Sequence, residues 1–217
     1  LNEDGTKAEY TEKATSDAIK FYVNLQNNDW CPTQEQFANT SATEQFFSGQ
    51  GAMFFAGSWD LANLCSTYTD MNGKWDVAVL PKCPNPESGD GRAVISNSVS
   101  YATAAEGKNK DTAMDFLKFL ASEEGQRIQG ESGVAIPAYN GLEDTWVNTF
   151  AENGYDIHPE NIIPMFDYSV KYVNNPSRPS WEPKVEQAVL DIYAGNMSVD
   201  DGIQNMQDIV TEAIAEE

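Results

Sequence analysis

Hydrophobic residues recur at helical spacing in several stretches of this chain. Residues 11–28 predict a helix, and five residues share its apolar face: Ala14, Ala18, Phe21, Tyr22 and Leu25. Residues 111–120 predict another helix with an inward face of Ala113, Phe116, Leu117 and Leu120. Ser122 is expected to cap a short helix that ends at Gly130.

The C-terminal part of the chain continues this helical pattern. Residues 198–201 resemble a capping box, and the helix that follows is expected to bury Ile203, Met206, Val210 and Ile214. Residues 141–160 show weaker periodicity, so we expect them to be irregular to weakly helical.

Short apolar runs between these helices predict strands. Residues 52–56 are apolar and bounded by glycines, and residues 75–80 form an apolar run that Pro81 ends. Within residues 93–104, alternating apolar positions fit a half-buried strand. Strands that alternate with longer helices predict an α/β fold.

Trp59 lies where the first of these strands would turn into a helix. Gly57 and Ser58 form the turn, Ser58 is a candidate N-cap, and Asp60 would lie in the first helical turn, where a negative charge suits the helix dipole. In open α/β sheets, ligands bind beyond the carboxyl ends of the strands. From this spacing, the Trp59 ring is either a stacking surface for a ligand or a lid over the core.

The charge of the chain narrows the class of partner. Thirty-four acidic and 13 basic residues give a net charge of −21, which argues against nucleic acid or an anionic membrane as a partner. The acidic residues are spread along the chain, which is typical of a solvated acidic surface. No stretch approaches the roughly 20 apolar residues of a membrane-spanning helix. Cys31, Cys65 and Cys83 are expected to be free, with one pair possible.

Signatures of enzymes are sparse. The single histidine, His158, leaves little material for a catalytic triad or a histidine-rich metal site. No nucleophile-elbow, zinc-protease or phosphate-loop motif is present. We therefore expect no catalytic residue, no metal and no cofactor.

Five segments resemble one known family in their expected order. Phe47, Gly49, residues 51–53 and the Gly-Ser-Trp of residues 57–59 resemble the signature of the extracellular solute-binding proteins of ABC importers, the sugar-binding family that includes maltose-binding protein. The other matching segments are residues 75–81, 95–105 with 108–120, 122–137, and 175–183. The resemblance extends from about residue 10 to the end of the chain.

The resemblance implies a periplasmic-binding-protein-like (type II) fold, of which this chain resembles the C-terminal half. Residues 1–98 and 160–217 would form the C-terminal lobe, and residues 99–159 would belong to the N-terminal lobe. Without the rest of that lobe, Phe116, Leu117 and Leu120 are expected to be exposed. The family's leader peptide and lipid-attached cysteine have no counterpart here, so we expect a truncated fragment of a lipoprotein.

The resemblance also implies a function. We expect the protein to bind a carbohydrate, such as an oligosaccharide, outside the cell or in the periplasm, and to deliver it to the permease subunits of an ABC transporter. It would contact the membrane only through a lipid anchor that this chain lacks. The alternatives are a non-sugar solute bound by the same fold, a glycan-acting enzyme, or a carbohydrate-binding module.

Candidate ligand-binding residues follow from the chemistry of sugars. Sugar rings present apolar C–H faces and polar rims, so a binding site combines aromatic rings with amides, hydroxyls and carboxylates. The resemblance favours Trp59 and Trp181 as the stacking rings. The polar candidates and the weaker aromatic one are Asp60, Ser96, Asn97, Ser98, Arg178 and Tyr139. Asp60 could instead serve only the helix dipole, and Asn97 could satisfy backbone groups at a bend.

Overall fold

The computed structural model describes residues 1–86 and 89–216, which pack as two compact units. Unit 1 contains residues 1–54, 84–86, 89–91 and the chain from Tyr172 onward. Unit 2 contains Phe55–Cys83 and Arg92–Lys171. The boundaries of these units differ from the division expected at residues 98 and 159. The assignment of segments to the lobes of a whole protein stays a prediction.

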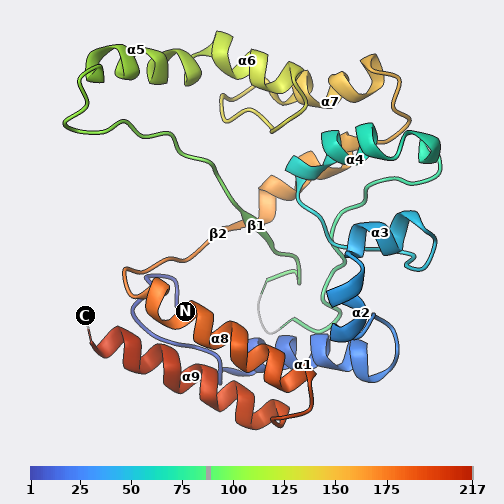
Figure 1. Cartoon of the computed structure of the whole chain (residues 1–217), viewed down its shortest axis with the longest axis vertical. Coiled ribbons are helices and arrows are strands. Elements are labelled where there is room, and N and C mark those ends of the chain that lie inside the picture. Colours follow the sequence, from blue (N-terminus) through green and yellow to red (C-terminus); the bar gives the residue numbers. More distant parts are fainter. Residues whose placement is uncertain (87–88, 217) are drawn as a thin grey trace. The chain divides into compact units, whose positions relative to one another are not determined.

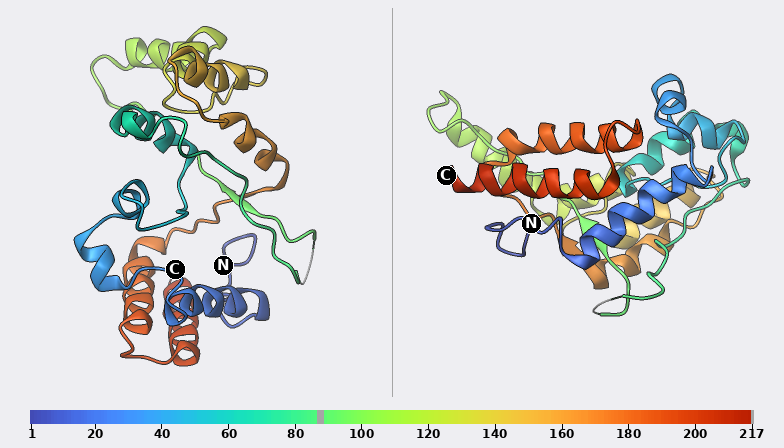
Figure 2. Two further views of the ribbon diagram at one scale, coloured as in Figure 1. Left: turned by 90° about the vertical axis from the view of Figure 1, so that its right-hand side faces the viewer. Right: turned by 90° about the horizontal axis from the view of Figure 1, so that it is seen from below.

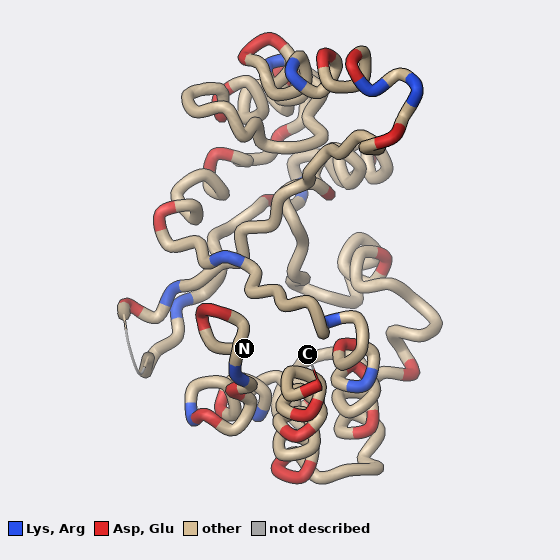
Figure 3. Tube along the Cα trace, turned by 90° about the vertical axis from the view of Figure 1, so that its left-hand side faces the viewer, with Lys and Arg blue, Asp and Glu red and all other residues tan. Residues whose placement is uncertain are grey.

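The regular secondary structure described in unit 1 is helical. Its helices are α1 (Lys13–Asn27), α2 (Gln34–Asn39), α3 (Ala42–Phe47), α8 (Arg178–Tyr193) and α9 (Val199–Ala215). Helices α8 and α9 lie side by side (Figures 1 and 2). Figure 3 shows acidic residues along α9, which has four acidic residues and no Lys or Arg.

Helix α9 begins as the sequence predicts. The Ser198 hydroxyl accepts a hydrogen bond from the Asp201 backbone N–H at 3.1 Å, which satisfies one of the donors left free at a helix start. The predicted inward residues Ile203, Met206 and Val210 are buried, and Ile214 is half-buried. Helix α9 therefore faces the core with the predicted stripe.

Helix α1 forms where predicted but buries a different face. Val23 is buried and Ile19 packs beside it in the same cluster, whereas Phe21 and Tyr22 are exposed. Ala14 and Ala18 are also exposed, and Leu25 is half-buried. Both stripes have helical spacing, and the choice depends on contact with α8 and α9, which the local pattern does not contain.

Unit 2 combines helices with one pair of strands. Its elements are η1 (Ser58–Asp60), α4 (Leu61–Thr67), η2 (Thr69–Met71), β1 (Val94–Ser96), α5 (Lys110–Leu120), α6 (Glu123–Glu131), α7 (Glu143–Glu152), η3 (Pro159–Tyr168) and β2 (Ser169–Lys171), where η marks a 3₁₀ helix. The two strands are parallel, with Ile95 opposite Val170. The α/β class is thus confirmed, although the described sheet is small.

Two predicted strands are absent from the described secondary structure. Residues 52–56 are not paired with any strand, and Met53 is 88% exposed. Residues 75–80 are likewise not paired with a strand. A side chain binds their backbone instead, because Asn161 Nδ2 donates a hydrogen bond to the Val77 carbonyl at 3.0 Å. The predicted strand 93–104 is reduced to β1. A strand needs a partner for its backbone groups, and an apolar run alone does not supply one.

The helical predictions for unit 2 need two corrections. Residues 143–152 form a regular helix, α7, whose Trp146 and Phe150 are buried. Helix α6 begins as predicted, because Ser122 Oγ accepts from the Gly125 N–H at 3.2 Å. The helix continues past Gly130, however, and the positive φ of 72° occurs at Gly133.

Of two other expectations, the exposure of α5 agrees with the structure in part, and the free cysteines agree with it fully. Helix α5 has no buried residue, and Phe116 is exposed, while Leu117 and Leu120 are only half-buried. All three cysteines are free, and burial raises the pKa of the Cys65 thiol to about 11. In the described part of the chain, no helix combines the length and the apolar character needed to cross a bilayer.

Candidate functional site

Trp59 lies on an exposed turn immediately before a buried helix. Its side chain is 55% exposed, and among the described residues its indole N–H makes no hydrogen bond. The turn is the 3₁₀ helix η1, and residues 55–57 before it are not a strand. The ring is therefore available to a ligand, and the lid alternative is not supported.

The carboxylate of Asp60, rather than the Ser58 hydroxyl, contacts the free backbone at the start of this turn. Asp60 Oδ2 accepts a long hydrogen bond of 3.4 Å from the Gly57 N–H. The predicted N-cap role of Ser58 is thus wrong, because Gly57 occupies the cap position. Since the bond is long, most of the hydrogen-bonding capacity of the Asp60 carboxylate stays available.

The residue beside the indole ring is a glycine, Gly57. A Cβ atom at Gly57 would lie 2.3 Å from Trp59 Cε2, much closer than atoms can approach. The ring thus lies directly against the Gly57 backbone. Any larger residue at position 57 would move the ring, so Gly57 sets the direction in which Trp59 is presented.

Helix α4 anchors the turn to the core of unit 2. Leu61, Leu64 and Cys65 are buried, and Leu61 and Cys65 belong to the same cluster as Trp146 and Phe150. Buried apolar side chains each contribute about 1.5–3 kcal/mol, so the base of the turn is held firmly. This anchoring keeps an exposed aromatic ring on a rigid element.

The polar candidates of unit 2 lie at and after the end of β1. Ser96 is the last residue of the strand, and Asn97 and Ser98 follow it. All three are exposed, and none of their side chains hydrogen-bonds within the described chain. The alternative that Asn97 satisfies the backbone at a bend is therefore not seen, and the three groups are available to hydroxyls of a ligand.

Tyr139 lies on the segment that connects α6 and α7. Its ring is partly exposed. Trp146 Nε1 donates to the Gly133 carbonyl at 3.0 Å, and the side-chain oxygen Oε1 of Gln126 accepts from the Ala138 N–H at 2.7 Å. These two bonds fix the segment at its start and next to Tyr139.

The structure does not support Trp181 as a stacking ring. The side chain is only 7% exposed and packs in a cluster with Ala8, Val210 and Ala213. Its indole N–H donates to Asn175 Oδ1 at 3.1 Å. The ring is therefore buried by the protein, and Trp181 is a core residue of unit 1.

Arg178 is occupied by neighbours on its own unit. Its guanidinium donates to Glu182 Oε1 from Nε at 2.9 Å and also from Nη2. It also lies over the Tyr172 ring, 4.2 Å from the ring centre. The Glu182 hydrogen bond, outweighing the cost of desolvation, raises the pKa of Arg178. A ligand would have to compete with both contacts.

The eight candidates thus divide between the two units. Trp59 and Asp60 share one turn, and Ser96, Asn97 and Ser98 share the end of β1; with Tyr139 they all belong to unit 2. Trp181 and Arg178 share α8 in unit 1. Among the described residues, no group of three or more His, Cys, Asp or Glu side chains is arranged to hold a metal ion.

Sequence reasoning missed an ion pair between His158 and Asp76. His158 Nδ1 lies 2.6 Å from Asp76 Oδ2, and the His158 backbone N–H donates to Asp76 Oδ1 at 2.8 Å. Nearby, Asn72 accepts from the Asp156 N–H and donates to the Gly154 carbonyl. Together these bonds attach residues 72–77 to residues 154–158, although the two segments are about eighty positions apart in sequence.

We expect the pair to titrate with a pKa above the ordinary histidine value of 6.5. The hydrogen bond and charge of Asp76 raise the pKa of His158. Burial opposes ionisation of Asp76, but hydrogen bonds from the His158 and Val77 N–H groups and from the His158 ring outweigh it and lower its pKa. A raised histidine pKa means that the stabilisation is complete below the unfolded pKa and is lost as pH rises through the folded pKa.

NMR titration of the His158 ring protons checks this expectation. In the wild-type protein the midpoint should lie above 6.5, and in Asp76→Asn it should return toward 6.5. Protection factors at residues 154–158, which remove the intrinsic pH dependence of amide exchange, should be lower above the midpoint than below it. An unchanged midpoint in Asp76→Asn would show that the pair does not form in solution.

Comparison with known proteins places this geometry in context. A family model described as bacterial extracellular solute-binding protein matches residues 1–127, which is more than half of the chain. A sugar transporter from Rhizobium etli, solved in an open conformation, shares the fold with a TM-score of 0.69 at 21% sequence identity. The similarity covers 96% of this chain and 53% of that one, so this chain spans about half its length. No curated protein matches this chain.

Proposed function

This chain belongs to the family of bacterial extracellular solute-binding proteins, and we propose that the protein binds a carbohydrate and delivers it to the permease of an ABC importer. Membership of the family gives the protein an extracellular or periplasmic location and a solute-binding role. The carbohydrate, its oligosaccharide nature and the transporter partner are the proposal. The proposal includes no catalytic step.

The observation that carries the proposal is the exposed ring of Trp59. An indole held against Gly57 at the start of an anchored helix offers a flat apolar surface with a free N–H at its edge. Sugar rings have apolar C–H faces surrounded by hydroxyls, which complement such a surface. The similar fold of a protein described as a sugar transporter supports the same ligand class.

The polar groups of unit 2 supply the second half of such a site. Ser96, Asn97 and Ser98 offer hydroxyl and amide groups that the chain itself does not use. Asp60 adds a carboxylate and Tyr139 a partly exposed ring. In this proposal, ligand binding favours a closed state of a two-lobed protein, as expected when a ligand contacts the closed state more extensively.

Replacement of Trp59 tests the proposal. We expect one class of oligosaccharide to raise the melting temperature of the wild-type protein in a glycan-panel thermal shift assay. Trp59→Ala should weaken the affinity for that glycan by about tenfold or more, because a buried aromatic contact is worth about 1–2 kcal/mol at a binding surface. Titration calorimetry with the same glycan gives the dissociation constants.

The matched control is Trp30→Ala, which removes an exposed indole from unit 1. It should leave affinity unchanged. If no glycan raises the melting temperature but a polyamine, a metal chelate or a peptide does, the protein binds a non-sugar solute. Release of shorter sugars from the bound glycan, abolished by replacing one carboxylate, would instead identify a glycan-acting enzyme.

A further inference from the structure

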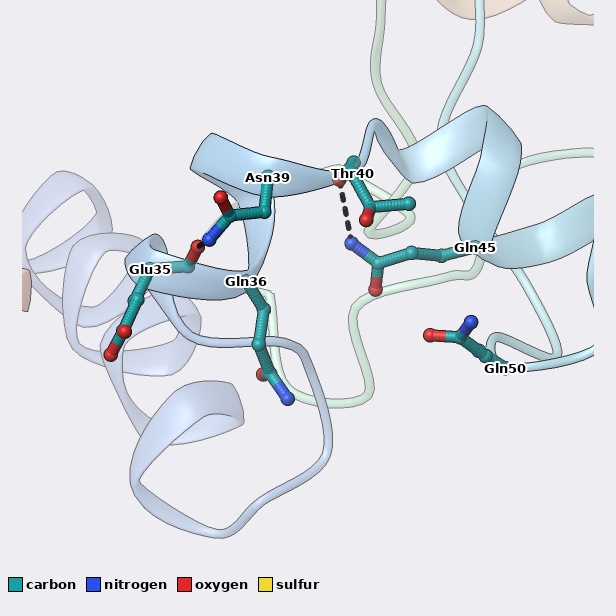
Figure 4. A pocket seen from close by; sticks show the side chains of 6 residues that line it. All are labelled: Glu35, Gln36, Asn39, Thr40, Gln45 and Gln50. Carbon is teal, nitrogen blue, oxygen red and sulfur yellow. Dashed lines mark hydrogen bonds between the residues drawn. The ribbon is translucent and has the colours of Figure 1, made fainter.

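Unit 1 contains a hollow of about 220 Å³ that is lined by six residues with polar side chains (Figure 4). The residues that line it come from α2, α3 and the turns after them: Glu35, Gln36, Asn39, Thr40, Gln45 and Gln50. None of the candidate residues discussed above takes part. The hollow therefore requires its own interpretation.

Two capping boxes fix the walls of the hollow. The Thr33 hydroxyl accepts from the Gln36 N–H at 3.3 Å, and Gln36 Oε1 accepts from the Thr33 N–H at 2.8 Å. At the start of α3, Ser41 and Glu44 exchange the equivalent bonds. Because both short helices are closed in this way, the hollow lies between ordered elements.

Gln45 presents an oxygen atom to the hollow. The side chain is only 6% exposed, and its Nε2 donates to the Thr40 carbonyl at 2.9 Å. Its Oε1 accepts no hydrogen bond within the described chain. No fully buried polar side-chain atom of the described residues lacks a partner, so this oxygen must reach the opening beside it.

Gln50 adds an amide whose hydrogen-bonding groups are unused. Its backbone N–H and that of Gly51 both donate to the Gln45 carbonyl, at 2.8 and 2.9 Å. Gly49, with φ of 79°, makes this close turn possible. The backbone is therefore fixed, while the side-chain amide of Gln50 makes no hydrogen bond within the described residues and lies beside Gln45 in Figure 4.

The remaining lining groups define the chemistry of a ligand. The side-chain oxygen of Gln36 accepts a hydrogen bond in the capping box, and its NH₂ group is unused. The NH₂ group of Asn39 donates to the Glu35 carbonyl, and its side-chain oxygen is unused. The lining residues thus leave both donors and acceptors unused. The one charged lining group is the carboxylate of Glu35, which points away from Gln45 and Gln50 in Figure 4 and disfavours an anionic ligand.

We propose that this hollow binds one uncharged, polyhydroxylated ring, such as a monosaccharide unit, independently of the Trp59 surface. Each hydroxyl both donates and accepts, so it can bond an amide NH₂ and an amide oxygen at once. The volume lies below the roughly 300 Å³ at which sites for drug-sized ligands begin, which fits a single ring. The inference goes beyond the proposed function, because it involves neither Trp59 nor a transporter.

NMR spectra of the side-chain amides test the inference, with D-glucose as the probe. Saturating D-glucose should shift the Gln45 and Gln50 side-chain signals in the wild-type protein. Gln50→Ala should raise the dissociation constant about three- to tenfold, as expected for loss of one or two hydrogen bonds. The variant should fold normally, because the Gln50 side chain is exposed and makes no hydrogen bond in the described chain.

Two controls separate this site from the Trp59 surface. Gln204→Ala changes an exposed glutamine of α9 and should leave the dissociation constant unchanged. Trp59→Ala should also leave the Gln45 and Gln50 shifts intact, even if it abolishes binding of the transported solute. Loss of the glucose response in Trp59→Ala, or an unchanged constant in Gln50→Ala, would overturn the inference. Binding of putrescine in place of D-glucose would overturn the ligand class.

Discussion

Trp146→Ala is expected to lower the free energy of unfolding of unit 2 by about 3–5 kcal/mol, the range for truncating a buried aromatic side chain. Trp146 has no exposed surface. It packs edge-to-face against Phe150, with 5.1 Å between ring centres, and lies in the cluster of Leu61 and Cys65 beneath the Trp59 turn. Its indole N–H also donates a hydrogen bond to the Gly133 carbonyl. Truncation therefore leaves a cavity and an unpaired backbone carbonyl.

Urea denaturation followed by far-ultraviolet circular dichroism measures this loss without relying on tryptophan fluorescence. Trp30→Ala is the matched control, since the same side chain is removed from an exposed position. It should change the free energy of unfolding by less than about 0.5 kcal/mol. An equal loss in the two variants would show that Trp146 is not part of a folded core in solution.

Two helix starts could be predicted from the sequence, because an N-cap depends on three or four adjacent residues, whereas the cap expected at Ser58 and the helix end expected at Gly130 were wrong. Ser122 and Ser198 cap helices as expected, through bonds to backbone N–H groups three residues later. The capping boxes at Thr33 and Ser41 are equally local, although residues 31–43 gave no separate prediction for them. Such bonds form within one turn and need no information from the rest of the fold.

Strands depend on partners that are distant in sequence, and here prediction fails. Residues 52–56 and 75–80 have the apolar runs of buried strands, yet neither is paired in the described structure. The short pair β1 and β2 joins residues about 75 positions apart. A local pattern specifies which residues are apolar, but it does not specify which backbone lies alongside them.

The candidate site shows the same limit for tryptophans. Trp59 and Trp181 were both predicted to stack on a ligand, yet one is exposed and the other is in the core. Trp181 is buried because α8 packs on α9, and the α9 residues in its cluster, Val210 and Ala213, lie about thirty positions away in sequence. The hollow between α2 and α3 could not be predicted from the sequence. Its glutamines have no distinctive spacing and resemble ordinary surface residues until the two helices bring them together.

Gly130→Ala is expected to destabilise unit 2 by about 1–3 kcal/mol, although alanine is the better helix former. Gly130 lies in α6, where a Cβ atom would be 1.9 Å from Thr145 Oγ1 and 2.9 Å from Pro137 Cγ. Thr145 Oγ1 itself donates to the Leu142 carbonyl at 2.6 Å, at the start of α7. The added methyl group must therefore separate two packed helices or break that bond.

A double-mutant cycle identifies the clash as the cause. Thr145→Ala removes the nearest atom, so Gly130→Ala should cost less free energy in that background than in the wild-type protein, as measured by urea denaturation. Gly51→Ala is the control, because the nearest atom to a Cβ there is 3.8 Å away. A stabilising effect of Gly130→Ala, of the size that helix propensity alone gives, would mean that α6 and α7 do not approach closely at Gly130 in solution. A destabilisation that Thr145→Ala relieves would show that α6 and α7 approach closely at Gly130 in solution.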